Sequence, residues 1–214
     1  MRILLINPNT SRSTTDQMVA IAGTVAPPST DIIGVTAPRG VPMILTAHEL
    51  AAAAPVVLEM GISEGANFDG IIVGAFGDPG LAALRERMAV PVVGIAEAAI
   101  LEAAARGHRF GVATTTPALV DVIAARVREL GVADLYTGIR LTQGDPLTLV
   151  ADPPGLVEAL AEAVRQSISC DGAQAVIIGG GPLGRAAIAL ASRFTTPIIA
   201  PIPAAVRRLV HVVS

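Results

Sequence analysis

The sequence predicts a soluble α/β protein built from two similar halves, with a small-molecule site in the cleft between them. Short apolar runs alternate with longer helical segments from one end of the chain to the other. A strand–turn–helix pattern found in the first half recurs in the second half. Hydrophobic residues make up 52% of the 214 residues and charged residues only 15%, so the chain can bury a large core.

Charge and composition narrow the class of partner. The formal net charge is -3 and no basic stretch is present, which argues against nucleic acid or an anionic membrane as the partner. No apolar run reaches the roughly 18 residues of a membrane-spanning helix, and the first residues lack the pattern of a signal peptide. Cys170 is the only cysteine, so an internal disulfide is excluded and we expect a cytoplasmic protein.

Eight apolar runs are predicted to form strands. They lack the polar alternation of half-exposed strands, and most are rich in β-branched residues, as is typical of parallel strands covered on both faces. Their alternation with helical segments predicts parallel sheets with right-handed crossovers. The predicted strands are residues 2–6, 32–35, 70–74, 92–95, 110–113, 135–139, 175–178 and 198–200.

The helical segments between these strands are rich in Ala, Leu and Glu, for example at residues 47–65, 119–130 and 156–167. No Gly/Ser linker or charge run marks a boundary between the halves, so we expect them to be joined tightly through a helix near residues 97–106. We predict a first subdomain of residues 1–96 with 203–214, and a second of residues 97–202.

The internal repeat is the most informative feature. The strand at 70–74 is followed by Ala-Phe-Gly-Asp-Pro-Gly, a helix and a Pro-led strand, and the strand at 175–178 is followed by Gly-Gly-Gly-Pro-Leu-Gly, a helix and a Pro-led strand. Chance similarity between two βα units is the alternative interpretation. Two matched segments in the same order favour duplication. The repeat aligns Ala75 with Gly180.

The candidate site lies where the strands end, because ligands of parallel sheets bind beyond the carboxyl ends of the strands. If the halves are related by a pseudo-two-fold axis, the turns at 7–11, 75–80, 114–116 and 179–184 line one cleft. Helix capping explains some of their polar residues equally well. Glycine lets the backbone approach a ligand, and helix amino ends favour an anionic or carbonyl group. The candidate binding residues are Asn7, Asn9, Thr10, Ser11, Phe76, Gly77, Thr114, Thr115, Gly179, Gly181 and Pro182.

Other motifs carry less weight. Gly179, Gly181 and Gly184 match the spacing of a dinucleotide fingerprint, but no acidic residue follows the next strand to hold a ribose. Asp78 and Glu97 are candidate bases, although either could serve a helix amino end instead. His48, His108 and His211 are expected to be structural or exposed. The sequence contains no metal-ligand cluster, phosphate loop or Gly-x-Ser-x-Gly elbow, so we expect no metal site.

Three segments together resemble the hydantoin and allantoin racemases of the aspartate/glutamate racemase superfamily. They read Ile6-Asn-Pro-Asn-Thr-Ser11, Phe76-Gly-Asp-Pro-Gly-Leu81 and Gly94-Ile-Ala-Glu-Ala-Ala99. The resemblance spans nearly the whole chain, including the internal repeat. It implies two four-stranded parallel sheets flanked by helices and related by a pseudo-dyad, without metal or organic cofactor.

The resemblance also implies racemisation by two cysteines, one from each half, that flank the substrate Cα and move its proton from face to face. The chain departs from this pattern at both positions, because the residues there are Ala75 and Gly180. Cys170 is expected at the opposite end of the sheet. An engineered replacement would account for one missing cysteine, whereas the loss of both favours a natural branch.

Two functions of different kinds therefore stay open. The first is a hydantoin-racemase-like enzyme acting on a hydantoin-, ureide- or amino-acid-like molecule by cofactor-independent proton transfer at Cα. Its base would be Asp78, Glu97, His48 or a bound water, with Asn9 and Thr115 orienting the substrate; a lyase or isomerase of the same fold is a variant. The second is a non-catalytic small-molecule-binding homologue. We expect a small-molecule partner and association into a homo-oligomer.

Overall fold

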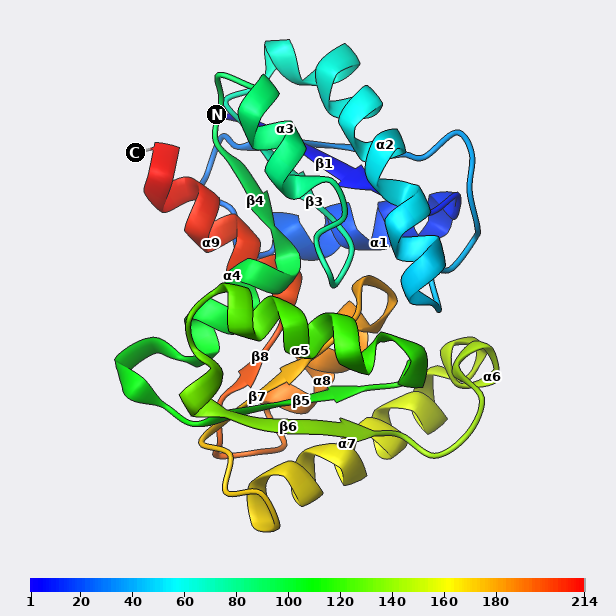
Figure 1. Cartoon of the computed structure of the whole chain (residues 1–214), viewed down its shortest axis with the longest axis vertical. Coiled ribbons are helices and arrows are strands. Elements are labelled where there is room, and N and C mark those ends of the chain that lie inside the picture. The colour runs from blue at the N-terminus through cyan, green and yellow to red at the C-terminus, as the bar shows by residue number, and fades with distance from the viewer. Residues whose placement is uncertain (214) are drawn as a thin grey trace.

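The computed structural model describes residues 1–213 and contains two four-stranded parallel sheets. Figure 1 shows one sheet in each half of the molecule, with helices around both. The first sheet contains β1 (Arg2–Asn7), β2 (Asp31–Thr36), β3 (Gly70–Val73) and β4 (Val92–Gly94). The second contains β5 (Phe110–Thr114), β6 (Tyr136–Leu141), β7 (Ala175–Ile178) and β8 (Ile198–Ile199). All eight predicted strands are confirmed, with ends that differ by at most two residues.

The two sheets have the same strand order, which is β2-β1-β3-β4 in the first and β6-β5-β7-β8 in the second. Every pair of neighbouring strands is parallel. β1 and β3 occupy the centre of one sheet, and β5 and β7 occupy the centre of the other. The four turns that the sequence analysis predicted to line the site follow the carboxyl ends of these four central strands.

The helices are α1 (Arg12–Gly23), α2 (Ala47–Glu64), α3 (Leu81–Arg87) and α4 (Ile95–Ala103), then α5 (Val120–Glu129), α6 (Pro146–Ala151), α7 (Pro153–Ser169), α8 (Gly184–Ala191) and α9 (Pro201–Val213). Local signals set several of their starts. The Ser11 hydroxyl caps α1, and Thr46 and Glu49 form a reciprocal capping box at the start of α2. The short helix α6, which the sequence analysis did not predict, starts at Pro146 after the capping residue Asp145.

Alternate side chains of β1 belong to two different hydrophobic cores, one on each face of the first sheet. Leu4 and Ile6 pack against α2 and α3 on the outer face, whereas Ile3 and Leu5 point into the middle of the molecule. The middle core also contains Phe110 of β5 and side chains of α4 and α9, so it joins the two sheets. A third core lies between the second sheet and α7 and α8. Burial of this shared apolar layer explains why no flexible linker separates the halves.

Two helices connect the halves. The chain leaves β4 directly into α4 and then enters β5, and after β8 it enters α9, which packs against α4, β3 and β4 (Figure 1). The boundaries proposed from the sequence, at 96/97 and 202/203, fall inside these helices and stay a prediction. Among residues 1–213, no helix combines the length and the apolar character that crossing a membrane requires.

Candidate small-molecule site

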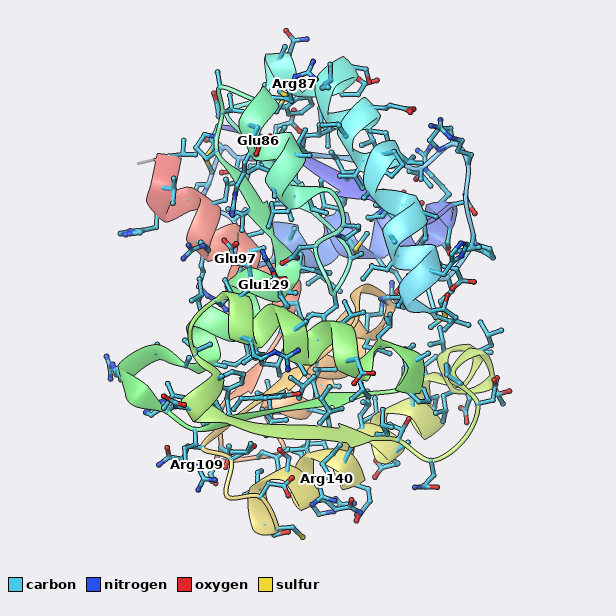
Figure 2. The ribbon with its side chains drawn as sticks, in the orientation of Figure 1. Glu86, Arg87, Glu97, Arg109, Glu129 and Arg140 are labelled. Carbon is cyan, nitrogen blue, oxygen red and sulfur yellow. The ribbon has the colours of Figure 1, made fainter. Side chains whose placement is uncertain are left out.

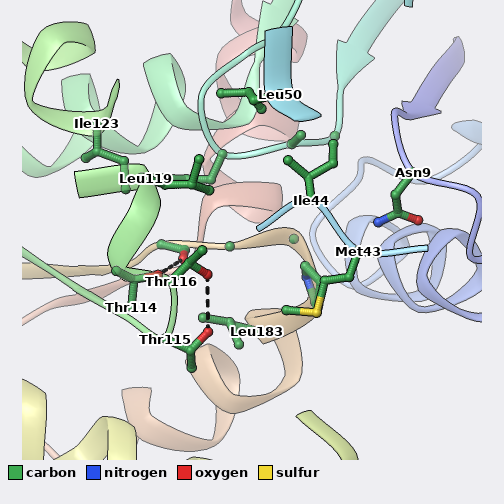
Figure 3. Close-up of a pocket in the computed structure, with 17 residues that line it drawn as sticks. Asn9, Met43, Ile44, Leu50, Thr114, Thr115, Thr116, Leu119, Ile123 and Leu183 are labelled. Carbon is green, nitrogen blue, oxygen red and sulfur yellow. Dashed lines mark hydrogen bonds between the residues drawn. The ribbon is translucent and has the colours of Figure 1, made fainter. Parts of the chain in front are cut away.

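A cavity lies between the two halves at the carboxyl ends of the central strands (Figure 3). The turns after β3, β5 and β7 form much of its wall, and residues from the loop before α2 and from α5 complete it. Its lining residues are Asn9, Met43, Ile44, Leu50, Gly74, Ala75, Phe76, Thr114, Thr115, Thr116, Leu119, Ile123, Gly179, Gly180, Gly181, Pro182 and Leu183.

The turns after β3 and β7 touch each other at one side of this cavity. A Cβ atom built on Gly181 would lie 3.0 Å from the carbonyl oxygen of Gly74, and one built on Gly179 would lie 3.1 Å from Cε1 of Phe76. Both distances are shorter than ordinary carbon contacts allow, so glycine at these positions permits the close approach. The glycine-rich turns therefore bring the two halves together around the cavity.

Asn9 is the one side chain from the turn after β1 that lines the cavity. Its Oδ1 accepts hydrogen bonds from Nδ2 of Asn7 at 2.9 Å and from the amide of Ser11 at 2.9 Å. Asn7 is fully buried, and its Oδ1 accepts from the Asn9 amide at 3.1 Å. Because Oδ1 of Asn9 is held in this way, its Nδ2 is left to face the cavity, as Figure 3 shows.

Three threonines follow β5, and they serve different purposes. The Thr114 hydroxyl donates to the Gly179 carbonyl at 2.7 Å and so links the ends of β5 and β7. The hydroxyls of Thr115 and Thr116 lie 3.5 Å apart and make no other hydrogen bond within residues 1–213 (Figure 3). Thr115 and Thr116 can therefore donate to or accept from a ligand in the cavity.

The backbone of the three turns adds further donors. Several residues that line the cavity have amide N–H groups with no hydrogen-bond acceptor in the described part of the chain. Buried or half-buried amides are normally paired in folded proteins. These unpaired amides can therefore donate to the carbonyl or anionic groups of a ligand. These amides belong to Ala75, Phe76, Thr115, Thr116 and Gly180.

The structure brings together most of the predicted binding residues. The cavity is lined by Asn9, Phe76, Thr114, Thr115, Gly179, Gly181 and Pro182, with Ala75 and Gly180 between them. Four predicted residues do not line it: Asn7 supports Asn9, Ser11 caps α1, and Thr10 and Gly77 lie beside the lining.

The apolar wall of the cavity was not predicted. Met43 and Ile44 come from the loop before α2, Leu119 immediately precedes α5, and Ile123 lies on α5. The loop has no periodic pattern that would place it over a site. The sequence predicted a helix over residues 119–130, but not which surface it would meet.

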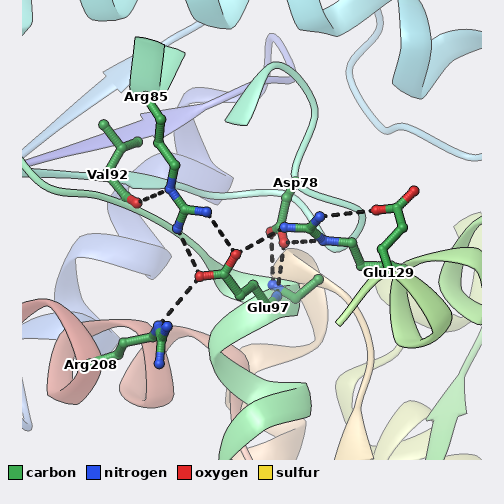
Figure 4. Close-up of polar contacts among 8 residues, drawn as sticks. Asp78, Arg85, Val92, Glu97, Glu129 and Arg208 are labelled. Atoms are coloured by element: carbon green, nitrogen blue, oxygen red, sulfur yellow. Dashed lines mark hydrogen bonds and ion pairs between the residues drawn. The ribbon is translucent and has the colours of Figure 1, made fainter. Parts of the chain in front are cut away.

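Asp78 and Glu97, the two candidate bases, do not line the cavity. Oδ1 of Asp78 accepts from the Ala96 amide at 2.9 Å, and Oδ2 accepts from the Glu97 amide at 2.8 Å (Figure 4). Asp78 therefore caps the amino end of α4. A Cβ atom at Gly94 would collide with the Asp78 carboxylate, which explains the glycine immediately before this helix. This contact joins two segments about 18 residues apart, and neither motif reveals it alone.

Glu97 is held by three arginines (Figure 4). Its carboxylate oxygens lie 2.7 Å from Nη2 of Arg85, 3.0 Å from Nη2 of Arg126 and 3.3 Å from Nε of Arg208. Figure 2 shows Glu97 and Glu129 at the junction of the halves, with Arg109 and Arg140 far from it. A carboxylate engaged by three cations is a structural centre and has no free oxygen for a substrate proton.

The two buried carboxylates have opposite pKa shifts. Burial raises the pKa of Asp78 to about 6, although the amides of Ala96 and Glu97 and the charge of Arg126 act in the other direction. Burial also opposes ionisation of Glu97, but hydrogen bonds and charge from Arg85, with Arg208 and Arg126, outweigh it and lower the pKa of Glu97. Each shift has a local structural cause outside the cavity.

In the second half, the helix that corresponds to α4 is α9, and its amino end has no acidic capping residue. In the repeat, Asp78 aligns with Leu183 and Glu97 aligns with Pro203. The helix α9 starts with Pro201 and Pro203, which have no N–H group to satisfy. An acidic cap is therefore not needed at the start of α9.

The remaining candidates lie away from the cavity. His48 and His211 are exposed, and His108 lies in the segment before β5; none of the three lines the cavity. Cys170 is exposed at the end of α7, before the amino end of β7, so it lies across the sheet from the cavity. Within residues 1–213, no group of three or more His, Cys, Asp or Glu side chains could hold a metal ion.

The fold and site define a class: a two-sheet α/β protein with a small-molecule cavity between its halves. The model of the Asp/Glu/hydantoin racemase family matches residues 3–209, and the chain belongs to this family. A hydantoin racemase of Paenarthrobacter aurescens is 30% identical over 209 residues, covering 97% of this chain and 89% of the relative.

Solved structures agree with this family. The allantoin racemase of Pseudomonas fluorescens has a TM-score of 0.94 at 30% identity, covering 100% of this chain and 91% of that one. The allantoin racemase of Klebsiella pneumoniae has a TM-score of 0.92 at 33% identity, covering 100% of this chain and 87% of that one. The fold predicted from the sequence is confirmed by these neighbours and by the two sheets themselves.

Proposed function

We propose that the protein binds a small cyclic ureide of the hydantoin or allantoin type in this cavity and acts as a cofactor-independent racemase-type isomerase at its Cα. Relatives named hydantoin racemase and allantoin racemase, each matched over nearly the whole chain, support this substrate class. The cavity supports it as well, because one wall offers hydrogen-bond donors and the other is apolar.

One observation carries the proposal: unpaired donors from both halves converge on the same cavity. Five cavity-lining amides and Nδ2 of Asn9 have no acceptor within residues 1–213; the amides are those of Ala75, Phe76, Thr115, Thr116 and Gly180. The ring carbonyls of a ureide are the acceptors that such donors suit. When the Cα proton leaves, negative charge collects on the adjoining carbonyl oxygen, and preorganised donors stabilise that charge.

The proton carrier in this proposal is water. No titratable side chain lines the cavity among residues 1–213. A water on one face of the ring takes the Cα proton, and the electron pair moves into the carbonyl to give an enolate. A water on the opposite face then returns a proton to Cα, which inverts the centre, and the hydroxide that it leaves takes up the proton gained by the first water, so that both waters are restored. The hydroxyls of Thr115 and Thr116 are placed to orient such a water.

A second candidate function is ligand binding without turnover. The observation that favours it is the same lack of an acid or base in the cavity lining. The two candidates make the same prediction for affinity and opposite predictions for exchange of the Cα proton.

The test is proton–deuterium exchange at Cα, followed by NMR in heavy water with single enantiomers of 5-substituted hydantoins and allantoin. Calorimetry on the same compounds measures binding. Exchange above the buffer rate with loss of optical purity supports the racemase. Binding without exchange supports the second candidate. A protein that shows no binding and no exchange contradicts both candidates. Cys170→Ser is the control, because an exposed distant thiol should not contribute.

Two further expectations belong to this proposal. A cytoplasmic location fits a chain whose only cysteine is exposed and unpaired. Association into a homo-oligomer fits α2, where Ala51, Ala52, Pro55 and Ile62 are exposed. Sedimentation velocity of the protein checks the second expectation.

A further inference from the structure

A groove continues from the cavity between the two halves. The groove and the cavity share Met43 and Pro182, so the two spaces meet at these side chains. One side of the groove comes from the first turns of α1, and the other comes from α6, α7 and α8. Its remaining lining residues are Ser11, Ser13, Thr14, Gln17, Pro42, Leu147, Val150, Pro153, Leu156, Val157, Arg185, Ala186 and Ala189.

The side formed by the second half is apolar. Leu147 of α6 is 54% exposed, one of the largest exposures of any large hydrophobic side chain in residues 1–213. Val150 and Val157 extend this surface along the groove. An exposed leucine beside other apolar side chains favours contact with an apolar ligand group over contact with water.

One charged side chain, that of Arg185, lies beside this apolar surface of the groove. Arg185 is the only charged residue among those described as lining the cavity or the groove. It lies at the start of α8, it is exposed, and it has no ion-pair partner within residues 1–213. A guanidinium group suits a carboxylate, which it can bind through two parallel hydrogen bonds.

We propose that the groove is a subsite for the substituent of the same ligand, which carries an apolar chain ending in a carboxylate that meets Arg185. This inference rests on the proposed function for the ring in the cavity and adds the chemistry of its substituent. The continuity through Met43 and Pro182 favours an extension of the cavity ligand over a separate partner. The ligand class is a ureide ring bearing an ω-carboxyalkyl chain.

Three hydantoins test the inference by calorimetry: 5-methylhydantoin, 5-hexylhydantoin and 5-(5-carboxypentyl)hydantoin. We expect the hexyl compound to bind about tenfold tighter than the methyl compound, because each buried methylene adds to affinity. We expect the carboxypentyl compound to bind at least fivefold tighter than the hexyl compound. Equal affinity of the methyl and hexyl compounds would overturn the apolar subsite while leaving the proposed function intact. No binding of any of the three would contradict the proposed function, and the inference with it.

Two arginine variants separate the carboxylate contact from general charge. Arg185→Gln should bring the carboxypentyl compound to the affinity of the hexyl compound or below, and it should leave the methyl compound unchanged. Arg128→Gln is the matched control, because Arg128 is exposed on α5, has no ion-pair partner within residues 1–213 and lines neither space. Retained preference for the carboxylate in Arg185→Gln would overturn its role.

A blocking variant tests the groove itself. Ala189→Trp places a large side chain in the groove from an exposed position on α8. We expect it to lose the gain of the hexyl chain while binding 5-methylhydantoin normally, which also reports that the variant is folded. Unchanged affinity for the hexyl compound would overturn the subsite. So would a wild-type dimer that Ala189→Trp dissociates in sedimentation velocity, because a second copy would then occupy the groove.

Discussion

Asp78 and Arg126 form an ion pair across the junction between the two halves, with 3.3 Å between Oδ2 of Asp78 and Nε of Arg126. Asp78 belongs to the turn that also places Ala75 and Phe76 in the cavity, and Arg126 follows Ile123 by one turn of α5. The side chain of Asp78 is fully buried and that of Arg126 is 19% exposed. This contact therefore connects two walls of the cavity through groups that do not line it.

The first prediction concerns the pH dependence of stability. The pKa of Asp78 is raised to about 6 in the folded protein from the ordinary aspartate value of 3.8. A carboxyl with a raised folded pKa stabilises the fold when protonated, so its contribution is fully present below about pH 3.8 and is lost as the pH rises through 6. The unfolding free energy of the wild type relative to Asp78→Asn should fall by about 2 kcal/mol from pH 4 to pH 7.

Urea unfolding at several pH values measures this difference. Asp134→Asn is the control, because Asp134 is exposed and makes no ion pair within residues 1–213, so its difference from the wild type should stay nearly constant. A difference for Asp78→Asn that grows with pH would mean that Arg126 outweighs burial.

The second prediction concerns Arg126. Arg126→Met leaves the carboxylates of Asp78 and Glu97 buried with less positive charge beside them. Removing one partner of a buried ion pair costs about 3–5 kcal/mol, and we expect a loss toward the lower end because Arg85 and Arg208 still hold Glu97. Urea unfolding at pH 7 measures the loss.

Arg128→Met is the matched control on the same helix, where an exposed substitution should change stability by about 0.5 kcal/mol or less. Equal stabilities of the two variants would show that the cluster adds little to the junction.

The third prediction concerns how Asn7 supports Asn9. If Asn7 sets the orientation of the Asn9 amide, Asn7→Ala and Asn9→Ala should each weaken binding of 5-methylhydantoin by about five- to tenfold, the effect of one hydrogen bond. The double variant should be little weaker than either single variant, because both changes remove the same contact. Calorimetry measures the affinities, and Thr10→Ala is the neighbouring control. Additive losses would mean that Asn7 does not act through Asn9.

The sequence predicted the parts of this molecule that depend on local signals. The β-branched runs of β1, β3, β5 and β7 predicted the central strands, and the glycine and threonine turns after them predicted much of the cavity wall. These features depend on residue type and chain direction alone.

The sequence could not assign the roles that depend on tertiary contacts. Asp78 and Glu97 look like free carboxylates until the capping of α4 and the three arginines are seen. Met43 reaches the cavity from a loop whose sequence has no periodic pattern. In each case the partner lies far along the chain, so no local pattern could identify it.

The last prediction concerns the positions that the resemblance assigns to thiols. Ala75 has an ordinary backbone conformation and half-buried surroundings, so Ala75→Cys should fold with nearly unchanged stability. Gly180 has a φ of 154°, and a Cβ atom there would lie 3.1 Å from the Leu183 side chain. Gly180→Cys should therefore cost about 1–3 kcal/mol of stability, which urea unfolding measures.

Exchange at Cα then tests the site itself. Two thiols on opposite faces of the substrate would act as base and acid, so the folded double variant Ala75→Cys/Gly180→Cys should exchange the Cα proton of hydantoins faster than the wild type. The control is Gly172→Cys, which places a thiol beside Cys170, at the other end of the second sheet. A folded double variant that binds 5-methylhydantoin but exchanges no faster than the wild type would contradict the placement of the substrate Cα between Ala75 and Gly180.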